Sequence, residues 1–306
     1  MSEQFPTPPQ PPAGVIAHRD LAYVNDGHER QKLDLYLPAQ NAEGGAASPK
    51  NEDAEGGAAS AKSKGEKHPL IIWIHGGAFR VGSKEGNENN PLHFEYVTQG
   101  YALASINYRL SQHAIWPAQI EDCKAAVRWL RAHAAEYKLD PERFAAWGPS
   151  AGGHLVAMLG TAGHVSEFEV GAHLDVSSRV QCVVDYFGPT DFLQMDAQRP
   201  PDGMIHNAPD SPESELVGGN IQEHPDKVAR ANPITYVTAD VPPFLIVHGD
   251  ADPLVPYGQS VLLVDALQKV GADVTFYTVR DGGHGGFTDP AVPQLTAKFL
   301  AKHIGS

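Results

Sequence analysis

Cysteine is scarce in this sequence: the 306 residues contain two, Cys123 and Cys182. A fold held together by disulfides needs several closely spaced cysteines, so this class of small secreted scaffold is excluded. Cys123 lies in a helix-like apolar pattern and Cys182 in a strand-like apolar run. We therefore expect two buried thiols rather than a disulfide.

The sequence also lacks long apolar runs and an excess of basic residues. No stretch approaches the roughly 20 apolar residues that a transmembrane helix needs, so no membrane insertion is expected. The 23 Lys and Arg face 37 Asp and Glu, and the formal net charge is −14. Such a surface repels phosphate backbones, so nucleic acid is not an expected partner. The sequence has neither metal-ligand spacing nor a phosphate-binding loop, and we expect no metal and no cofactor.

Apolar residues make up 42% of the chain, enough for one large α/β domain. Residues 1–18 are polar and rich in proline and are predicted to form a disordered tail before a single domain over 19–306. No signal peptide is visible in this tail, so a cytoplasmic location is the default expectation, with secretion left open if a leader was removed. Residues 40–68 contain AEGGAAS twice and are predicted to form a flexible insertion. Residues 193–238 are long and weakly periodic, which favours a small cap or lid.

From residue 69 onward, apolar runs typical of buried parallel strands alternate with segments of helical periodicity. This alternation predicts a mostly parallel, doubly wound sheet flanked by helices. A hairpin over 21–37 precedes it, with its turn at NDGHER. We expect strands at 69–75, 102–108, 144–147, 182–187, 243–248 and 274–279, and helices at 117–139, around 155–159, at 260–270 and at 292–303.

Residues 148–152 read G-x-S-x-G and place Ser150 between a predicted strand and a predicted helix. This is the setting of a nucleophile elbow, in which a strained turn lifts the serine hydroxyl above the sheet. The flanking glycines allow the helix and the strand to approach closely. The N–H groups at the start of the helix face the position where negative charge develops.

His75-Gly76-Gly77 ends an earlier buried strand, about 75 residues before the serine. Two glycines allow a tight turn whose N–H groups point into a cavity. Acyl transfer requires such donors for the tetrahedral oxyanion, and the loss of one donor costs about 10²–10³ in rate. The two motifs together indicate acyl-transfer chemistry.

A serine nucleophile needs a base, and the base needs an orienting acid. Among 15 histidines, His284 stands in a glycine-flanked loop after the last predicted strand, where a base can reach the serine. His75 and His154 lie inside the two motifs and are expected to support them. The segment HGDADPLVP offers both Asp250 and Asp252 as the acid. The order Ser…Asp…His is that of α/β-hydrolases.

HGGAF, GPSAGGH, HGDADPLVP and GGHGGF, in this order, resemble motifs of bacterial α/β-hydrolase carboxylesterases, including the hormone-sensitive-lipase-like group. YRLS, WPAQIEDCKAAVRWLR, FGPTD and SPESELVGG are similar to its feruloyl-esterase and acetyl-esterase-like branch. The resemblance covers about residues 20–304 without the insertion, and implies an α/β-hydrolase fold. Its motif positions imply Ser150 as nucleophile, His284 as base and Asp252 as acid, with Asp250 as the fallback.

The same resemblance implies that the oxyanion hole consists of the N–H groups of Gly77, Ala78 and Ala151, although Ala78 replaces a glycine common in such families. The expected activity is therefore hydrolysis of carboxylic esters, on short-chain acyl or hydroxycinnamoyl (feruloyl-type) substrates, by a monomer or homodimer. Amide or formamide hydrolysis, a peptidase, and a non-catalytic binding protein are the alternatives. Four residues are candidate linings of the substrate pocket: Phe79, Met204, Ile205 and Leu216.

Overall fold

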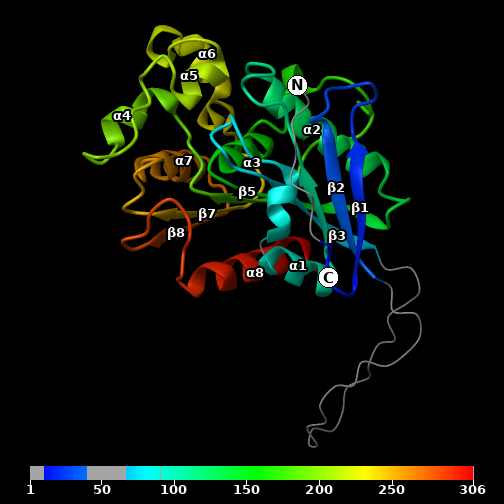
Figure 1. Ribbon diagram of the computed structural model, residues 1–306. Coiled ribbons are helices and arrows are strands. Elements are labelled where there is room, and N and C mark those ends of the chain that lie inside the picture. Colours follow the sequence, from blue (N-terminus) through cyan, green and yellow to red (C-terminus); the bar gives the residue numbers. More distant parts are fainter. Residues whose placement is uncertain (1–9, 40–66, 90, 306) are drawn as a thin grey trace, which may run out of the picture.

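The computed structural model describes residues 10–39, 67–89 and 91–305. In this part of the chain, eight strands form one sheet in the order β1-β2-β4-β3-β5-β6-β7-β8 (Figure 1). Both pairings of β2 are antiparallel, and the other pairings in the described sheet are parallel. The strands are β1 (Val15–Ala22), β2 (Lys32–Pro38), β3 (His68–Ile74), β4 (Ala102–Ile106), β5 (Leu139–Pro149), β6 (Cys182–Tyr186), β7 (Phe244–Gly249) and β8 (Val274–Val279).

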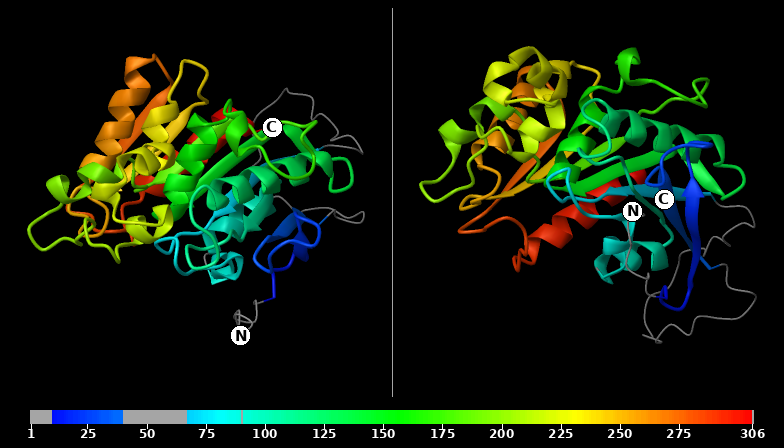
Figure 2. Two further views of the ribbon diagram at one scale, coloured as in Figure 1. Left: turned by 90° about the horizontal axis from the view of Figure 1, so that it is seen from above. Right: turned by 45° about the horizontal axis from the view of Figure 1, so that its top comes forward.

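Helices cover both faces of the sheet, so the predicted mostly parallel, doubly wound architecture is confirmed. Helices α1 and α8 lie on one face, and α2, α3 and α7 lie on the other (Figures 1 and 2). The α-helices are α1 (Pro91–Thr98), α2 (Ala118–Ala132), α3 (Ala151–Thr161), α4 (Met195–Gln198), α5 (Pro212–Val217), α6 (Pro225–Ala231), α7 (Gly258–Lys269) and α8 (Ala291–Ile304). The 3-10 helices are η1 (Lys84–Asn89), η2 (Ser166–Phe168), η3 (Phe192–Gln194), η4 (Ile221–Glu223) and η5 (Pro233–Tyr236).

The strand side chains alternate between two apolar layers, one on each face of the sheet. In β3, Leu70 and Ile72 pack in the layer that contains α2 and α3, while Ile71 packs in the layer that contains α1 and α8. This explains why the central strands read as continuous apolar runs. Cys123 and Cys182 are buried free thiols, as predicted.

Two predicted boundaries were wrong. The tail predicted over 1–18 extends too far toward the domain, and the helix predicted over 117–139 extends too far toward its C-terminus. β1 begins at Val15, which pairs with Pro38, so residues 15–18 belong to the sheet. Helix α2 ends at Ala132, and the chain turns through Lys138, whose φ is 55°. That turn allows Leu139 to pair with His68 and start β5. Periodicity alone missed this change because the apolar residues continue across it.

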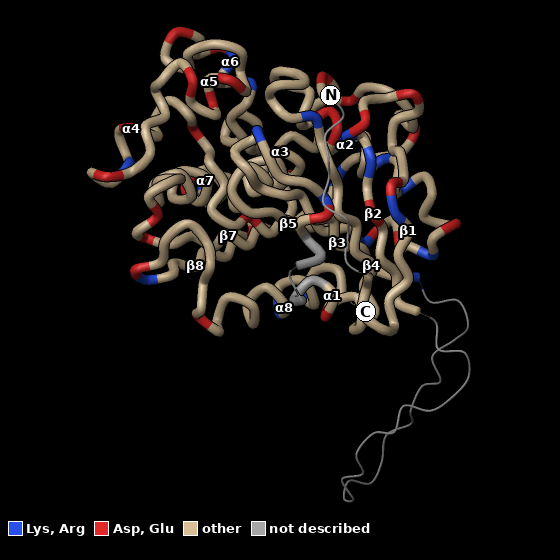
Figure 3. The backbone as a smooth tube through the Cα atoms, viewed as in Figure 1, with Lys and Arg blue, Asp and Glu red and all other residues tan. Residues whose placement is uncertain are grey.

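The segment predicted as a cap, 193–238, lies between β6 and β7 and contains α4, α5 and α6 with intervening 3-10 turns, at the upper left of Figure 1. The predicted insertion at 40–68 falls outside the described residues except for its last two positions. Acidic and basic residues are distributed over the loops, the helices and the strands β1 and β2 at one edge of the sheet (Figure 3). No helix in the described part of the chain has the length and apolar character needed to cross a bilayer.

Candidate active site

The turn between β5 and α3 holds Ser150 in a strained conformation. Its φ and ψ are 56° and −123°, in a region that residues with a side chain rarely adopt. An ideal Cβ on Gly152 would stand 2.0 Å from the carbonyl oxygen of Ile74, and one on Gly148 would stand 2.7 Å from the backbone of Gly152. Both glycines are therefore required by the close approach of α3 to the sheet. The N–H of Ser150 donates to the carbonyl of Tyr186 at 2.8 Å and ties the turn to β6.

Three side chains from different loops meet at the carboxyl ends of the parallel strands. The Nε2 atom of His284 lies 2.9 Å from Ser150 Oγ, and its Nδ1 atom lies 2.7 Å from Asp252 Oδ2. A carboxylate only accepts, so Nδ1 donates and Nε2 is left to accept the serine proton. These three predicted residues thus form one continuous hydrogen-bonded relay.

Asp252 is held in an environment that favours its charged form. Its carboxylate is buried and accepts the N–H groups of Leu254 and Val255 at 2.8 and 3.0 Å through Oδ1. Burial by itself would raise the pKa of Asp252, but hydrogen bonds from His248, His284 and the backbone outweigh it and hold the pKa well below its usual value. The acid therefore stays ionised beside the imidazole throughout the neutral range.

Asp250, the fallback acid, does not contact the base. Its Oδ1 accepts the N–H of Asp281 at 2.7 Å, and its Oδ2 lies 3.4 Å from an Arg280 nitrogen. Both contacts connect Asp250 to the loop that carries His284. Asp281, the nearer partner, precedes His284 by three residues. Asp250 thus holds the loop that carries His284 and does not take part in the Ser150–His284–Asp252 contacts.

The His-Gly-Gly turn after β3 lies against the serine. An ideal Cβ on Gly76 would stand 3.4 Å from Ser150 Cβ. The next residues, Gly77 and Ala78, have φ values of 118° and 54°. Among the described residues, neither of their N–H groups makes a hydrogen bond. The Gly77 carbonyl accepts the N–H groups of Arg80 and Val81 at 2.9 and 3.0 Å. The free donors, with that of Ala151 at the start of α3, are available to a developing oxyanion.

Sequence reasoning missed Arg30, a buried cation from the turn between β1 and β2. Its guanidinium donates to the carbonyls of Gly82 and Tyr108 at 2.7 and 2.8 Å and lies 3.3 Å from His75 Nε2. His75 in turn donates through Nδ1 to the Gly76 carbonyl at 2.7 Å. Burial first, and the Arg30 charge further, lower the pKa of His75 to about 3, against a raising effect of the Gly76 bond. A neutral His75 therefore supports the turn. The contact of Arg30 with this turn depends on where the β1–β2 hairpin packs, so the sequence alone does not predict it.

The residues predicted to line the substrate pocket are not brought together. Phe79 and Leu216 are 1% and 0% exposed and belong to the apolar core, so neither can line an open pocket. The Phe79 ring packs edge-on against His154. Met204 is half-buried and Ile205 is 57% exposed, and neither contributes to the cavity described next. Apolar character identified them, but it does not tell which way a side chain points.

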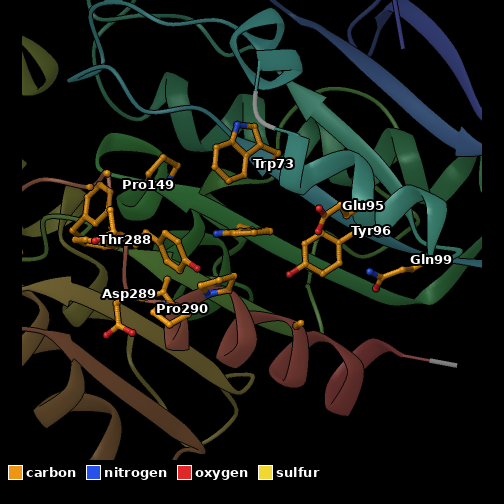
Figure 4. A pocket seen from close by; sticks show the side chains of 17 residues that line it. Trp73, Glu95, Tyr96, Gln99, Pro149, Thr288, Asp289 and Pro290 are labelled. Atoms are coloured by element: carbon orange, nitrogen blue, oxygen red, sulfur yellow. The ribbon is translucent and has the colours of Figure 1, made fainter. Parts of the chain in front are cut away.

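A cavity of about 510 Å³ lies between α1, α8 and the loop after His284 (Figure 4). Pro149 and Gly285, the chain neighbours of Ser150 and His284, form part of its wall. The Phe187 ring, also in the wall, lies 4.6 Å from the His284 ring, measured between centroids. Five further aromatic side chains line this wall beside polar and aliphatic ones: Trp73, Tyr96, Trp147, Tyr186 and Phe287.

The sheet order, the strained turn and the Ser–His–Asp arrangement define the class of protein: this chain has the α/β-hydrolase fold. A family model described as BD-FAE matches residues 59–267, and the chain belongs to that family. The matched range contains Ser150 and Asp252 and ends before His284, so the pairing of His284 with these two residues rests on the geometry above.

Curated relatives and solved structures agree with this family. The chain is 34% identical to "Probable carboxylic ester hydrolase LipM" and 30% identical to "Esterase LipQ", both of Mycobacterium tuberculosis, over 78% and 79% of its own length. In each case it covers 56% of the relative, so it spans about half the length of these proteins. Its fold matches a truncated carbohydrate esterase from gut microbiota with a TM-score of 0.79 and 33% identity, covering 95% of this chain and 98% of that one.

Proposed function

We propose that this chain is a serine carboxylic-ester hydrolase in which Ser150 is the nucleophile, His284 the general base and Asp252 the orienting acid. The observation that carries the proposal is the relay from the Ser150 hydroxyl through both nitrogens of His284 to the buried Asp252 carboxylate. The esterase names of the relatives support the same reaction class.

The reaction proceeds in two halves. Ser150 Oγ attacks the ester carbonyl while His284 Nε2 takes its proton, and Asp252 stabilises the resulting imidazolium. The N–H groups of Gly77, Ala78 and Ala151 stabilise the oxyanion, each contributing about 10²–10³ in rate. His284 then protonates the leaving alcohol, and an acyl-enzyme remains. Water attacks this intermediate by the same route in reverse and releases the carboxylic acid.

Ser150→Ala tests the nucleophile. Purified wild-type protein should hydrolyse p-nitrophenyl acetate or butyrate, and the variant should lose this turnover. Ser177→Ala, at an exposed serine outside the relay, is the matched control and should keep the wild-type rate. A Ser150→Ala rate within tenfold of wild type contradicts the assignment.

We further propose short-chain acyl or hydroxycinnamoyl esters as substrates. The aromatic cavity, whose wall includes Pro149 and Gly285 but not Ser150 or His284 themselves, supports the second of these, because its volume lies in the range of small-molecule pockets and planar rings stack on aromatic walls. Tyr96→Ala removes one ring of the wall. We expect it to lower kcat/KM for methyl ferulate by about tenfold and to leave p-nitrophenyl acetate nearly unchanged.

Tyr137→Ala is the matched control for the cavity variant, because Tyr137 packs against Trp129 and does not line the cavity. A panel of acetyl, butyryl, octanoyl and feruloyl esters then ranks the acyl groups. Equal losses on methyl ferulate and p-nitrophenyl acetate in Tyr96→Ala would show that the cavity does not bind the acyl group.

A further inference from the structure

A second histidine, His248, lies on the far side of the Asp252 carboxylate from the base. His248 stands near the end of β7, four residues before Asp252, and is fully buried. Its Nε2 atom is 3.3 Å from Asp252 Oδ2, the same oxygen that accepts the Nδ1–H of His284 at 2.7 Å. The acid of the relay is therefore held between two imidazoles, and the proposed reaction uses one of them.

The contacts of His248 define which nitrogen carries its proton. Nε2 makes its hydrogen bond to the Val255 carbonyl at 3.0 Å, and Asp252 Oδ2 lies beside it at 3.3 Å as a second, longer acceptor contact. Nε2 must therefore be a donor. Nδ1 lies 2.7 Å from Ser260 Oγ, a hydroxyl that can donate to it. A proton on Nε2 with Nδ1 as acceptor satisfies these contacts together.

The surroundings of His248 leave no other charged group to compete with Asp252 in the contacts that the described residues make. The Tyr257 ring approaches it at 5.7 Å, and the Tyr257 hydroxyl is occupied by Thr278 at 2.6 Å. The Phe187 ring approaches at 6.2 Å and is apolar. The polarity of His248 is thus directed at the acid, at the loop that carries the acid, and at Ser260.

We propose that His248 is a positioning residue of the relay: it orients the Asp252 carboxylate toward His284 and sets how strongly that carboxylate attracts the imidazolium. The orienting effect follows from the fixed place of His248 in β7, which holds the carboxylate of Asp252 against the sheet. The electrostatic effect follows because a second donor on Oδ2 draws negative charge away from His284. This inference rests on the proposed ester hydrolysis.

The sign of the electrostatic effect can be measured. Without the His248 donor, Asp252 stabilises the protonated form of the base more strongly, so the base takes up a proton at a higher pH. The acidic limb of the kcat/KM profile should then move to higher pH, by about half a unit to one unit. If His248 had only a structural role, its variants would contain less folded enzyme, and the acidic limb of the kcat/KM profile would stay at its wild-type pH.

Two amide variants separate the contacts. In His248→Gln, the longer amide can place its nitrogen where Nε2 stood and keep the donor to Asp252. In His248→Asn, the shorter amide reaches the position of Nδ1 and keeps only the Ser260 side. We expect His248→Asn to lower kcat/KM by about tenfold or more and to move the limb, and His248→Gln to restore both. Ser260→Ala, which removes only the Nδ1 partner, should leave the limb in place.

Active enzyme is counted in every variant by stoichiometric labelling of Ser150 with a fluorophosphonate, and the pH dependence of the labelling rate gives a second measure of the base. His248→Asn with a wild-type limb and a rate per labelled site within threefold of wild type overturns the proposal. His248→Gln moving the limb as far as His248→Asn also overturns it. If wild type neither labels nor hydrolyses esters, the proposed function fails instead, so the two failures are distinguished.

Discussion

Asp252→Asn replaces one carboxylate oxygen by an NH₂ group, and the surrounding contacts determine where that group goes. The N–H groups of Leu254 and Val255 both donate to Oδ1, so the amide oxygen stays at that position. The NH₂ group then occupies the position of Oδ2, 2.7 Å from His284 Nδ1. A donor facing Nδ1 forces the imidazole to carry its proton on Nε2 instead.

An imidazole with its proton on Nε2 cannot accept the proton of Ser150. In the triad of serine proteases the same inverted tautomer lowers kcat by about 10⁴-fold, which corresponds to about 5.4 kcal/mol in the activation free energy. We expect a loss of this size in Asp252→Asn. Shape and volume are nearly unchanged, so the protein should fold.

Asp250→Asn is the matched control for this variant, because it makes the same change two residues earlier. Its amide oxygen can still accept the N–H of Asp281, and its weak contact with the exposed Arg280 is worth little. We expect kcat/KM within about threefold of wild type. The assay is p-nitrophenyl butyrate hydrolysis per labelled active site. If Asp250→Asn lost more activity than Asp252→Asn, the acid would be Asp250 and the tautomer argument would be wrong.

Three further predictions concern stability. Gly152→Ala places a Cβ 2.0 Å from the Ile74 carbonyl, so Tm should fall by several degrees or the protein should fail to fold. His206 lies between two acceptors, Glu213 Oε2 and a carbonyl, and its pKa is raised; burial opposes the rise and the Glu213 bond outweighs it. Its stabilisation is complete below the unfolded pKa and lost as pH rises through the folded one, so the Tm difference between wild type and His206→Gln should be larger at pH 6 than at pH 9. Burial lowers the pKa of His154 to about 4. Its unfolded form gains a proton below about pH 6.5, so His154 contributes about 3 kcal/mol to the loss of unfolding free energy between pH 7 and pH 4, and the buried His75 adds its own contribution. In urea unfolding, a His154→Phe variant should therefore lose about 3 kcal/mol less than wild type over this interval.

The fold was predictable because its signals are local in the sequence. Continuous apolar runs identified the buried strands, and their alternation with helical patterns implied parallel pairing. The end of α2 was not predictable in this way, since the left-handed turn at Lys138 interrupts the helix without interrupting its apolar pattern. The start of β1 was missed for a related reason: residues 15–18 are ordered by their partners in β2.

By itself, the sequence determined the parallel sheet, the strained serine turn and the glycine turn beside it, because each depends on backbone sterics within a few consecutive residues. It also limited the acid to two aspartates in one short loop. Only the tertiary structure decided which aspartate faces His284, and that Phe79 and Leu216 pack inside the core. It alone brought Arg30 against the His-Gly-Gly turn, across 52 residues to Gly82. The reason is physical: side-chain direction and long-range contacts depend on how distant segments pack, and local patterns do not encode them.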